Sequence, residues 1–110
     1  DALPIFALTL PEGTTGGDLR TVATDLRNRL REEEAVIVLG AEDKGKFPFI
    51  AAATDKAVGR GVKSGDIVKQ FGQYVDGRGG GKPDMAQGSG STAAGAERGF
   101  AAVKDMLESL

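Results

Sequence analysis

The chain has 110 residues, of which 40 % are apolar, enough for one domain with a modest core. It contains neither cysteine nor histidine, which excludes disulfides, Ser–His and Cys–His catalytic pairs and most transition-metal sites. No apolar run approaches the roughly 20 residues that span a bilayer, so we expect a cytoplasmic protein without membrane contact. The chain begins with Asp1 rather than methionine, which suggests a fragment of a larger protein.

The net charge of −2 conceals an uneven distribution along the chain. Residues 1–55 carry ten acids and six bases, and residues 83–110 are also acidic. Residues 56–82, in contrast, carry six bases against two acids, a local charge of +4. Such a local excess of positive charge favours a polyanionic partner, although an ordinary solvated helix face would show it as well.

The N-terminal part of the chain predicts a strand followed by a helix. Residues 3–10 are nearly all apolar and end before Pro11, which predicts a strand buried on both faces. Asp18 is the expected N-cap of a helix over about 18–32, where leucine, valine and alanine recur at helical spacing and the arginines turn outward.

Two further apolar runs, 35–40 and 47–53, predict strands. The first strand, the helix and the second strand together form a right-handed βαβ unit with a parallel strand pair. The short polar connection over 41–46 makes the third strand antiparallel to the second. The sheet is therefore expected to be mixed.

The C-terminal half predicts two more helices. We interpret residues 55–61 as a loop, Ser64 as the cap of a second helix, and about 92–110 as a third helix. Gly95 and Gly99 in that third helix suggest a close approach to another backbone. The predicted fold class is α/β, of an α+β-like kind: a small mixed sheet with a βαβ unit, an antiparallel hairpin strand and about three packed helices.

Between these two helices, residues 77–91 read GRGGGKPDMAQGSGS and contain six glycines. Three interpretations compete. The stretch is a flexible linker, a tight crossing where the last helix packs on the sheet, or an anion cradle in which backbone N–H groups meet phosphates beside Arg78 and Lys82. It matches neither the dinucleotide fingerprint nor a Walker A loop.

The string GGGKPDMAQG over residues 79–88 closely resembles the glycine-rich motif near the C-terminus of alanyl-tRNA synthetases, in a DHH-associated domain of the first type. The order of elements and the segment GDIVK over 65–69 agree, so that the resemblance covers nearly the whole chain as a single domain over 1–110. Related phosphoesterases normally carry a histidine after the glycines, whereas this chain has Lys82, which favours the synthetase branch.

The resemblance implies a non-catalytic C-terminal accessory domain of a larger synthetase. Such a domain binds tRNA, here tRNA-Ala, near its outer elbow and helps to couple aminoacylation with editing. Its other partners are the remaining domains of the parent protein. ATP, magnesium and zinc are implied only for those other domains, and no cofactor is expected to bind this chain.

From the residues themselves we expect neither catalytic nor metal-binding groups. Glu32, Glu33 and Glu34 are interpreted as solvated charge, and Asp84 as a turn residue. With few aromatic residues to stack on bases, recognition of folded RNA through its shape and backbone is favoured. The candidate RNA-binding residues are Arg78, Gly79, Gly80, Gly81, Lys82 and Gln87, extended by Arg60 and Lys63.

Two alternatives remain open. One is the substrate-binding half of a DHH-type phosphoesterase that acts on short nucleotides. The other is a protein-interaction or dimerisation module, because exposed strand edges allow weak self-association.

Overall fold

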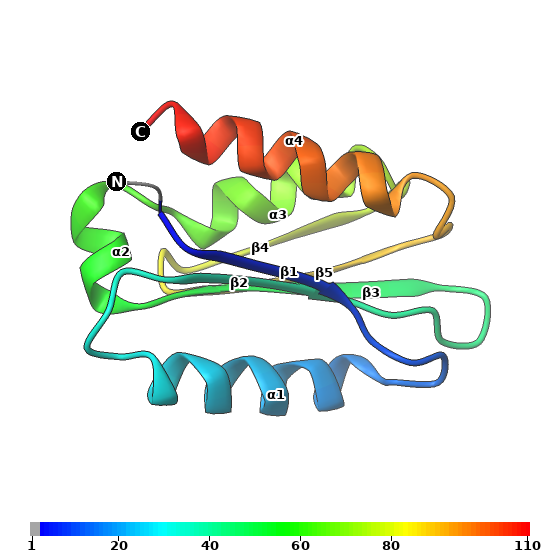
Figure 1. Cartoon of the computed structure of the whole chain (residues 1–110). Helices are drawn as coiled ribbons and strands as arrows, with labels where there is room; N and C mark the ends of the chain where they lie inside the picture. Colours follow the sequence, from blue (N-terminus) through cyan, green and yellow to red (C-terminus); the bar gives the residue numbers. More distant parts are fainter. Residues whose placement is uncertain (1–2) are drawn as a thin grey trace.

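The computed structural model describes residues 3–110; Asp1 and Ala2 lie outside the described part of the chain. A single sheet is covered by one helix on one face and by two on the other (Figure 1). The five strands are β1 (Ile5–Thr9), β2 (Val36–Gly40), β3 (Phe47–Ala53), β4 (Arg78–Gly81) and β5 (Met85–Gly90). The helices are α1 (Gly16–Arg29), α2 (Asp55–Arg60), α3 (Ser64–Gly72) and α4 (Ala96–Glu108).

The strand order in the sheet is β1-β2-β3-β5-β4. Strands β1 and β2 are parallel, with Ile5 opposite Val36, and all other neighbours are antiparallel. The predicted α/β class, the parallel pair and the antiparallel third strand are therefore confirmed. Strands β1 and β4 form the two opposite edges of the sheet.

A separate hydrophobic core fills each face of the sheet. Beneath the sheet, Leu19 and Ala23 of α1 pack on side chains of β2 and β3 such as Ile37. Above it, α3 and α4 cover a cluster of phenylalanines, in which the Phe71 ring centroid lies 5.0 Å from that of Phe49. These two cores fix α1 and α3 on opposite sides of the hairpin formed by β4 and β5.

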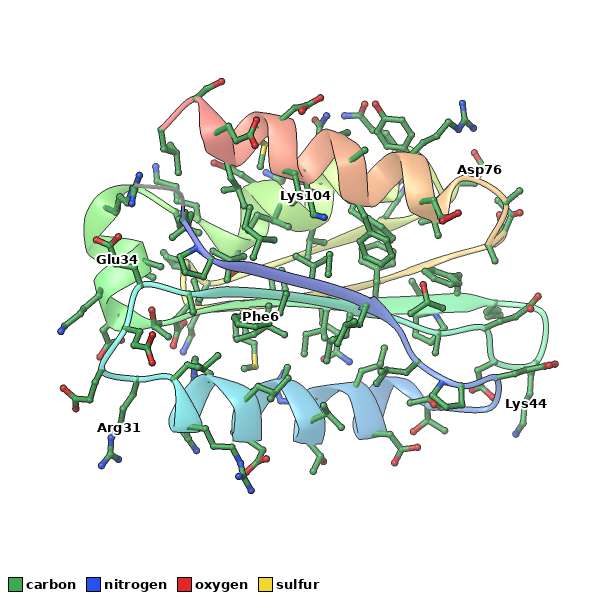
Figure 2. All side chains as sticks on the ribbon, in the orientation of Figure 1. Phe6, Arg31, Glu34, Lys44, Asp76 and Lys104 are labelled. Carbon is green, nitrogen blue, oxygen red and sulfur yellow. The ribbon has the colours of Figure 1, made fainter. Side chains whose placement is uncertain are left out.

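The prediction that the first strand is buried on both faces is wrong. Phe6 is 43 % exposed and Leu8 is 50 % exposed, because β1 is an edge strand that pairs only with β2. Figure 2 shows Phe6 on the side of the sheet that faces α1. An apolar run predicts a strand but does not say how completely the neighbouring elements cover it.

The helix caps differ from those predicted. Thr15, not Asp18, caps α1: its hydroxyl accepts from the Asp18 N–H at 3.1 Å, and the Asp18 carboxylate accepts from the Thr15 N–H at 3.1 Å. This reciprocal capping box places Asp18 in the first turn of the helix. At α3 the cap position is Lys63, and the Ser64 hydroxyl is buried without a hydrogen-bond partner among residues 3–110.

Residues 55–60 form a short helix, α2, where a loop was predicted. Thr54 caps it and is almost completely buried, with its hydroxyl accepting from the Ala57 N–H at 3.3 Å. The helix ends at Gly61, whose φ of 117° is the left-handed conformation that glycine adopts readily. At six residues, the helix is too short for its periodicity to stand out in the sequence.

The glycine-rich stretch is a β-hairpin, so the linker interpretation is wrong. Gly79 lies opposite Gly88, and β4 packs against α3 as well as against β5. The tight-crossing interpretation placed the close approach at the last helix, whereas the glycines of the stretch approach neighbouring strands: a Cβ at Gly77 would lie 2.8 Å from Gly90 Cα and one at Gly88 would lie 2.7 Å from the Phe49 ring. Neither approach leaves room for a methyl group.

The last helix begins at Ala96 rather than near residue 92, and Gly95 is its N-cap. The expected close approach is present, since a Cβ at Gly95 would collide with the Tyr74 carbonyl oxygen. A Cβ at Gly99 would meet the Phe71 ring at 2.9 Å. Among residues 3–110, no helix is long and apolar enough to cross a membrane.

Candidate nucleic-acid interface

The β4–β5 hairpin presents open backbone amides at its edge. Its turn closes where the Lys82 N–H donates to the Met85 carbonyl at 2.9 Å and the Met85 N–H donates back to Lys82 at 3.3 Å. Along an antiparallel ladder such exchanging pairs alternate with pairs whose amides point outward. The N–H groups of Gly79 and Gly81 therefore point away from β5 and can serve as donors to an external anion.

Side chains alternate between the two faces of β4, so that Arg78, Gly80 and Lys82 share one face. Gly80 lies between the two cations, and a Cβ placed on it would meet nothing within 4 Å. This face therefore carries two positive side chains separated by a position without any side chain, and the backbone there is open to an approaching ligand.

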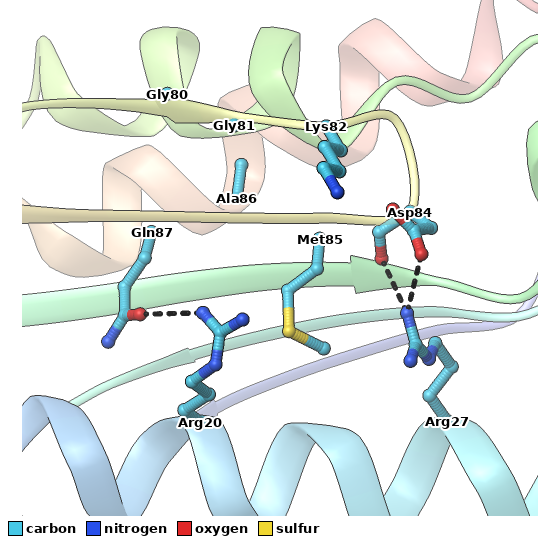
Figure 3. A pocket seen from close by; sticks show the side chains of 9 residues that line it. All are labelled: Arg20, Arg27, Gly80, Gly81, Lys82, Asp84, Met85, Ala86 and Gln87. Carbon is cyan, nitrogen blue, oxygen red and sulfur yellow. Dashed lines mark hydrogen bonds and ion pairs between the residues drawn. The ribbon is translucent and has the colours of Figure 1, made fainter.

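A cavity of about 340 Å³ lies on this face, between the hairpin and α1, and we call it the α1-side cavity (Figure 3). The side chains of Arg20 and Arg27 extend from α1 toward the hairpin, and the Lys82 side chain points toward α1 from the end of the hairpin. The complete lining is Arg20, Arg27, Gly80, Gly81, Lys82, Asp84, Met85, Ala86 and Gln87.

Polar contacts hold α1 to the hairpin across the α1-side cavity. Arg27 Nη1 donates to Asp84 Oδ2 at 3.0 Å, an ion pair in which the arginine is 26 % exposed and the aspartate 45 %. Gln87 donates from Nε2 to the Gly16 carbonyl at 2.8 Å and accepts a longer bond of 3.3 Å from Arg20. Asp84 is thus a turn residue that orders the hairpin, in line with its predicted role, while Arg20 has no carboxylate partner within residues 3–110.

A second cavity, of about 220 Å³, lies on the opposite side of β4, and we call it the α3-side cavity. It is formed by the start of α3 and by the hairpin. Its lining residues are Lys63, Gly65, Asp66, Lys69, Gly80, Gly81 and Pro83. Gly80 and Gly81 line both cavities, so only the bare backbone of β4 separates the two.

The basic side chains around β4 are mostly not neutralised by the fold. Within residues 3–110, Lys63, Lys69, Arg78 and Lys82 make no ion pair or side-chain hydrogen bond. The two cavities together present five basic side chains against two acidic ones. No group of three or more carboxylates that could hold a metal ion exists in the described part of the chain. The arrangement is suited to binding anions through charge and backbone amides.

Most of the predicted site residues come together at this edge. Those that lie on the hairpin or line one of the two cavities are Lys63, Arg78, Gly79, Gly80, Gly81, Lys82 and Gln87. Arg60 does not join them. It lies at the end of α2, lines neither cavity, and forms an ion pair of 2.8 Å with Glu34.

Three basic residues of the cavities were not among the predicted site residues: Arg20, Arg27 and Lys69. Lys69 belongs to the basic segment 56–82, so the charge distribution contained a signal for it. No pattern in the sequence connects the arginines of α1 with the hairpin, since more than 50 residues separate them, as the separation of 57 between Arg27 and Asp84 shows.

Residues 3–109 match the DHHA1 domain, and the chain therefore belongs to the DHHA1 domain family. Curated relatives of this chain include alanine–tRNA ligases. That of Corynebacterium jeikeium is 57 % identical over 103 residues, covering 94 % of this chain and 12 % of the relative. That of Nocardia farcinica is 50 % identical over 100 residues, covering 91 % and 11 %. The chain thus corresponds to a small part of these ligases, and the resemblance inferred from the glycine motif is confirmed.

Solved structures show the same fold. The C-Ala domain from Aquifex aeolicus alanyl-tRNA synthetase superposes with a TM-score of 0.83 at 22 % identity, covering 94 % of this chain and 89 % of that one. RecJ from Thermus thermophilus, in complex with Mn²⁺, gives a TM-score of 0.66 at 17 % identity and covers 96 % of this chain but 14 % of RecJ. At these identities the likeness concerns the fold alone.

Proposed function

We propose that the chain is a tRNA-binding accessory domain of an alanine–tRNA ligase, and that it helps to couple aminoacylation and editing on the same tRNA. The observation that carries this proposal is the glycine edge strand β4, with outward amides and flanking cations that have no acidic partner within residues 3–110. The 57 % identity to an alanine–tRNA ligase supports tRNA-Ala as the polyanion. We propose its outer elbow as the region bound, which is what the resemblance of the glycine motif implies. Such a domain acts in the cytoplasm, next to the other domains of the ligase.

In this proposal the hairpin contacts the RNA backbone rather than the base edges. Arg78 and Lys82 supply charge, and the amides of Gly79 and Gly81 donate to phosphate oxygens. Gln87 orients Arg20 and offers an amide, while Lys63 extends the surface toward α3. No cofactor is assigned to this chain; ATP, magnesium and zinc belong to the catalytic and editing parts of the ligase.

The alternative of a DHH-type phosphoesterase half has weaker support. RecJ shares the fold at 17 % identity, well below the identity to the ligases. The position after the three glycines is Lys82 rather than a histidine. At that position the hairpin therefore lacks the imidazole that could transfer a proton near neutral pH.

The test is tRNA-Ala affinity measured against salt concentration for the wild-type chain, Arg78→Ala and Lys82→Ala. Removal of one cation that meets a phosphate should lower the slope of log K against log salt by about 0.7–0.9 and should weaken binding almost regardless of RNA sequence. Lys104→Ala is the matched control, because Lys104 is an exposed lysine on α4 without an ion pair among residues 3–110 (Figure 2). Wild-type affinity and slope in both hairpin variants would show that the tRNA site lies elsewhere.

A further inference from the structure

The two cavities beside β4 lie on opposite faces of the sheet, yet they meet at the same two residues. The α1-side cavity contains Arg20 and the α3-side cavity contains Lys69, while Gly80 and Gly81 line both. We propose that one RNA strand crosses the edge of the sheet at these two glycines and places successive phosphates on either side of β4. This inference rests on the proposed tRNA binding and specifies how the backbone of the RNA is held.

Packing requires glycine at some positions of β4 and not at others, and this difference supports the crossing. A Cβ at Gly79 would lie 2.5 Å from Gly88 Cα, and one at Gly81 would lie 2.6 Å from the Met85 oxygen. Packing alone therefore requires these two glycines. Gly80 has neither such a neighbour nor a positive φ, so nothing in the described fold requires glycine there. An external chain that occupies the open space over Gly80 explains why this position is glycine.

The charges also fit a strand that reaches both sides. A single phosphate ion could occupy only one cavity at a time, whereas a nucleic-acid backbone carries one phosphate per nucleotide and can address both. Among residues 3–110, Lys69 has no partner and Arg20 has only the long bond to Gln87. Between the cavities, the outward amides of Gly79 and Gly81 can donate to the backbone that passes over them.

The decisive variant is Gly80→Val, which adds bulk at the crossing without changing charge and suits a strand position. Gly59→Val is the matched control, because a Cβ at Gly59 on α2 also meets nothing within 4 Å and lies outside both cavities. We expect Gly80→Val to lower tRNA-Ala affinity at least tenfold, while Gly59→Val binds as the wild type does. Circular dichroism and thermal melting verify that both variants are folded.

A second arm tests both sides of the strand by charge. Arg20→Ala and Lys69→Ala should each lower the salt slope by about 0.7–0.9, and the double variant should lower it by about the sum. In the Gly80→Val background one side is no longer reached, so at least one of the two alanine substitutions should leave the slope unchanged. The single and double alanine variants decide the question even if Gly80→Val is too unstable to measure.

The outcomes separate this inference from the proposed function. If folded Gly80→Val binds like the wild type while Arg78→Ala and Lys82→Ala weaken binding, tRNA binding stands and the crossing is wrong. If Arg20→Ala lowers the salt slope and Lys69→Ala leaves it unchanged, the RNA lies on the α1 side only. That result also overturns the crossing. If the wild-type chain does not bind tRNA at all, both proposals fail. Binding of tRNA-Ala that is indifferent to salt overturns the crossing as well, because contacts between basic side chains and phosphates would make the affinity fall with salt.

Discussion

Three consecutive glycines in β4 should respond differently to the same added methyl group. The perturbation is Gly79→Ala, Gly80→Ala or Gly81→Ala, made one at a time. At Gly79 the methyl would lie 2.5 Å from Gly88 Cα and 2.6 Å from Val68 Cγ1. Because one of these atoms is backbone of the paired strand, relief requires β4 and β5 to separate.

The expected magnitudes follow from these distances. Overpacking of this kind typically costs about 1–3 kcal/mol, and we expect Gly79→Ala in that range. Gly81→Ala should cost a similar amount, because its φ of 155° disfavours an L side chain and the methyl meets the Met85 oxygen at 2.6 Å. Gly80→Ala meets no atom within 4 Å, so it should be neutral or should stabilise the fold by about 0.4–1 kcal/mol through the unfolded state.

The assay is urea unfolding followed by far-ultraviolet circular dichroism, with thermal melting as a second measure. For a domain near this size, 1 kcal/mol shifts Tm by roughly 4–8 °C, so the variants should separate clearly. The midpoint should change while the m-value stays constant, which indicates an effect on native stability. A Gly80→Ala variant as unstable as Gly79→Ala would refute the assignment of Gly80 to open space, and with it the crossing geometry.

Two buried hydroxyls should behave in opposite ways. Thr54→Val should cost about 1–3 kcal/mol of unfolding free energy, since the Thr54 hydroxyl accepts from the Ala35 N–H at 3.0 Å and donates to the Glu33 carbonyl at 2.6 Å. Thr54→Ser keeps the hydroxyl and should retain most of this stability. An equal loss in both variants would contradict the role of the hydroxyl. Ser64→Ala should be neutral or stabilising by up to about 1 kcal/mol, because the Ser64 hydroxyl is buried without a partner among residues 3–110. A loss of about 1 kcal/mol in urea unfolding would instead support the cap predicted from sequence.

The central elements of the fold could be predicted because their sequence signals are long and consistent. The runs that form β2 and β3 are continuous and apolar, and both strands lie in the middle of the sheet, where such runs are buried on both faces. The same signal misled at β1, since hydrophobicity does not encode position in the sheet. The strand order decides that, and it arises from contacts distant in the sequence.

A different reason explains why the sequence did not predict the hairpin. Glycine has a low strand propensity, so GRGGG reads as a loop when each residue is judged on its own. In the fold, side-chain packing selects glycine in both strands: a Cβ at Gly79 of β4 would lie 2.6 Å from Val68 Cγ1, and one at Gly88 of β5 would lie 2.7 Å from the Phe49 ring. The proximity of these neighbours is a tertiary property, and it outweighs the local preference.

The candidate site shows why charge summed along the chain is an incomplete guide. Arg20 and Arg27 belong to the segment 1–55, whose ten acids and six bases make it look unsuited to a polyanion. Strand β5 lies next to β3, and α1 packs against β3, so Arg20 and Arg27 of α1 reach the hairpin. The two acids of α1, Asp18 and Asp25, make their contacts elsewhere. Asp25, for example, pairs with Arg29 on the exposed side of α1 at 2.8 Å. The bases around β4 therefore come from two segments that are distant in the sequence, α1 and residues 63–82. For this reason substitutions on α1 belong in any test of RNA binding by the hairpin.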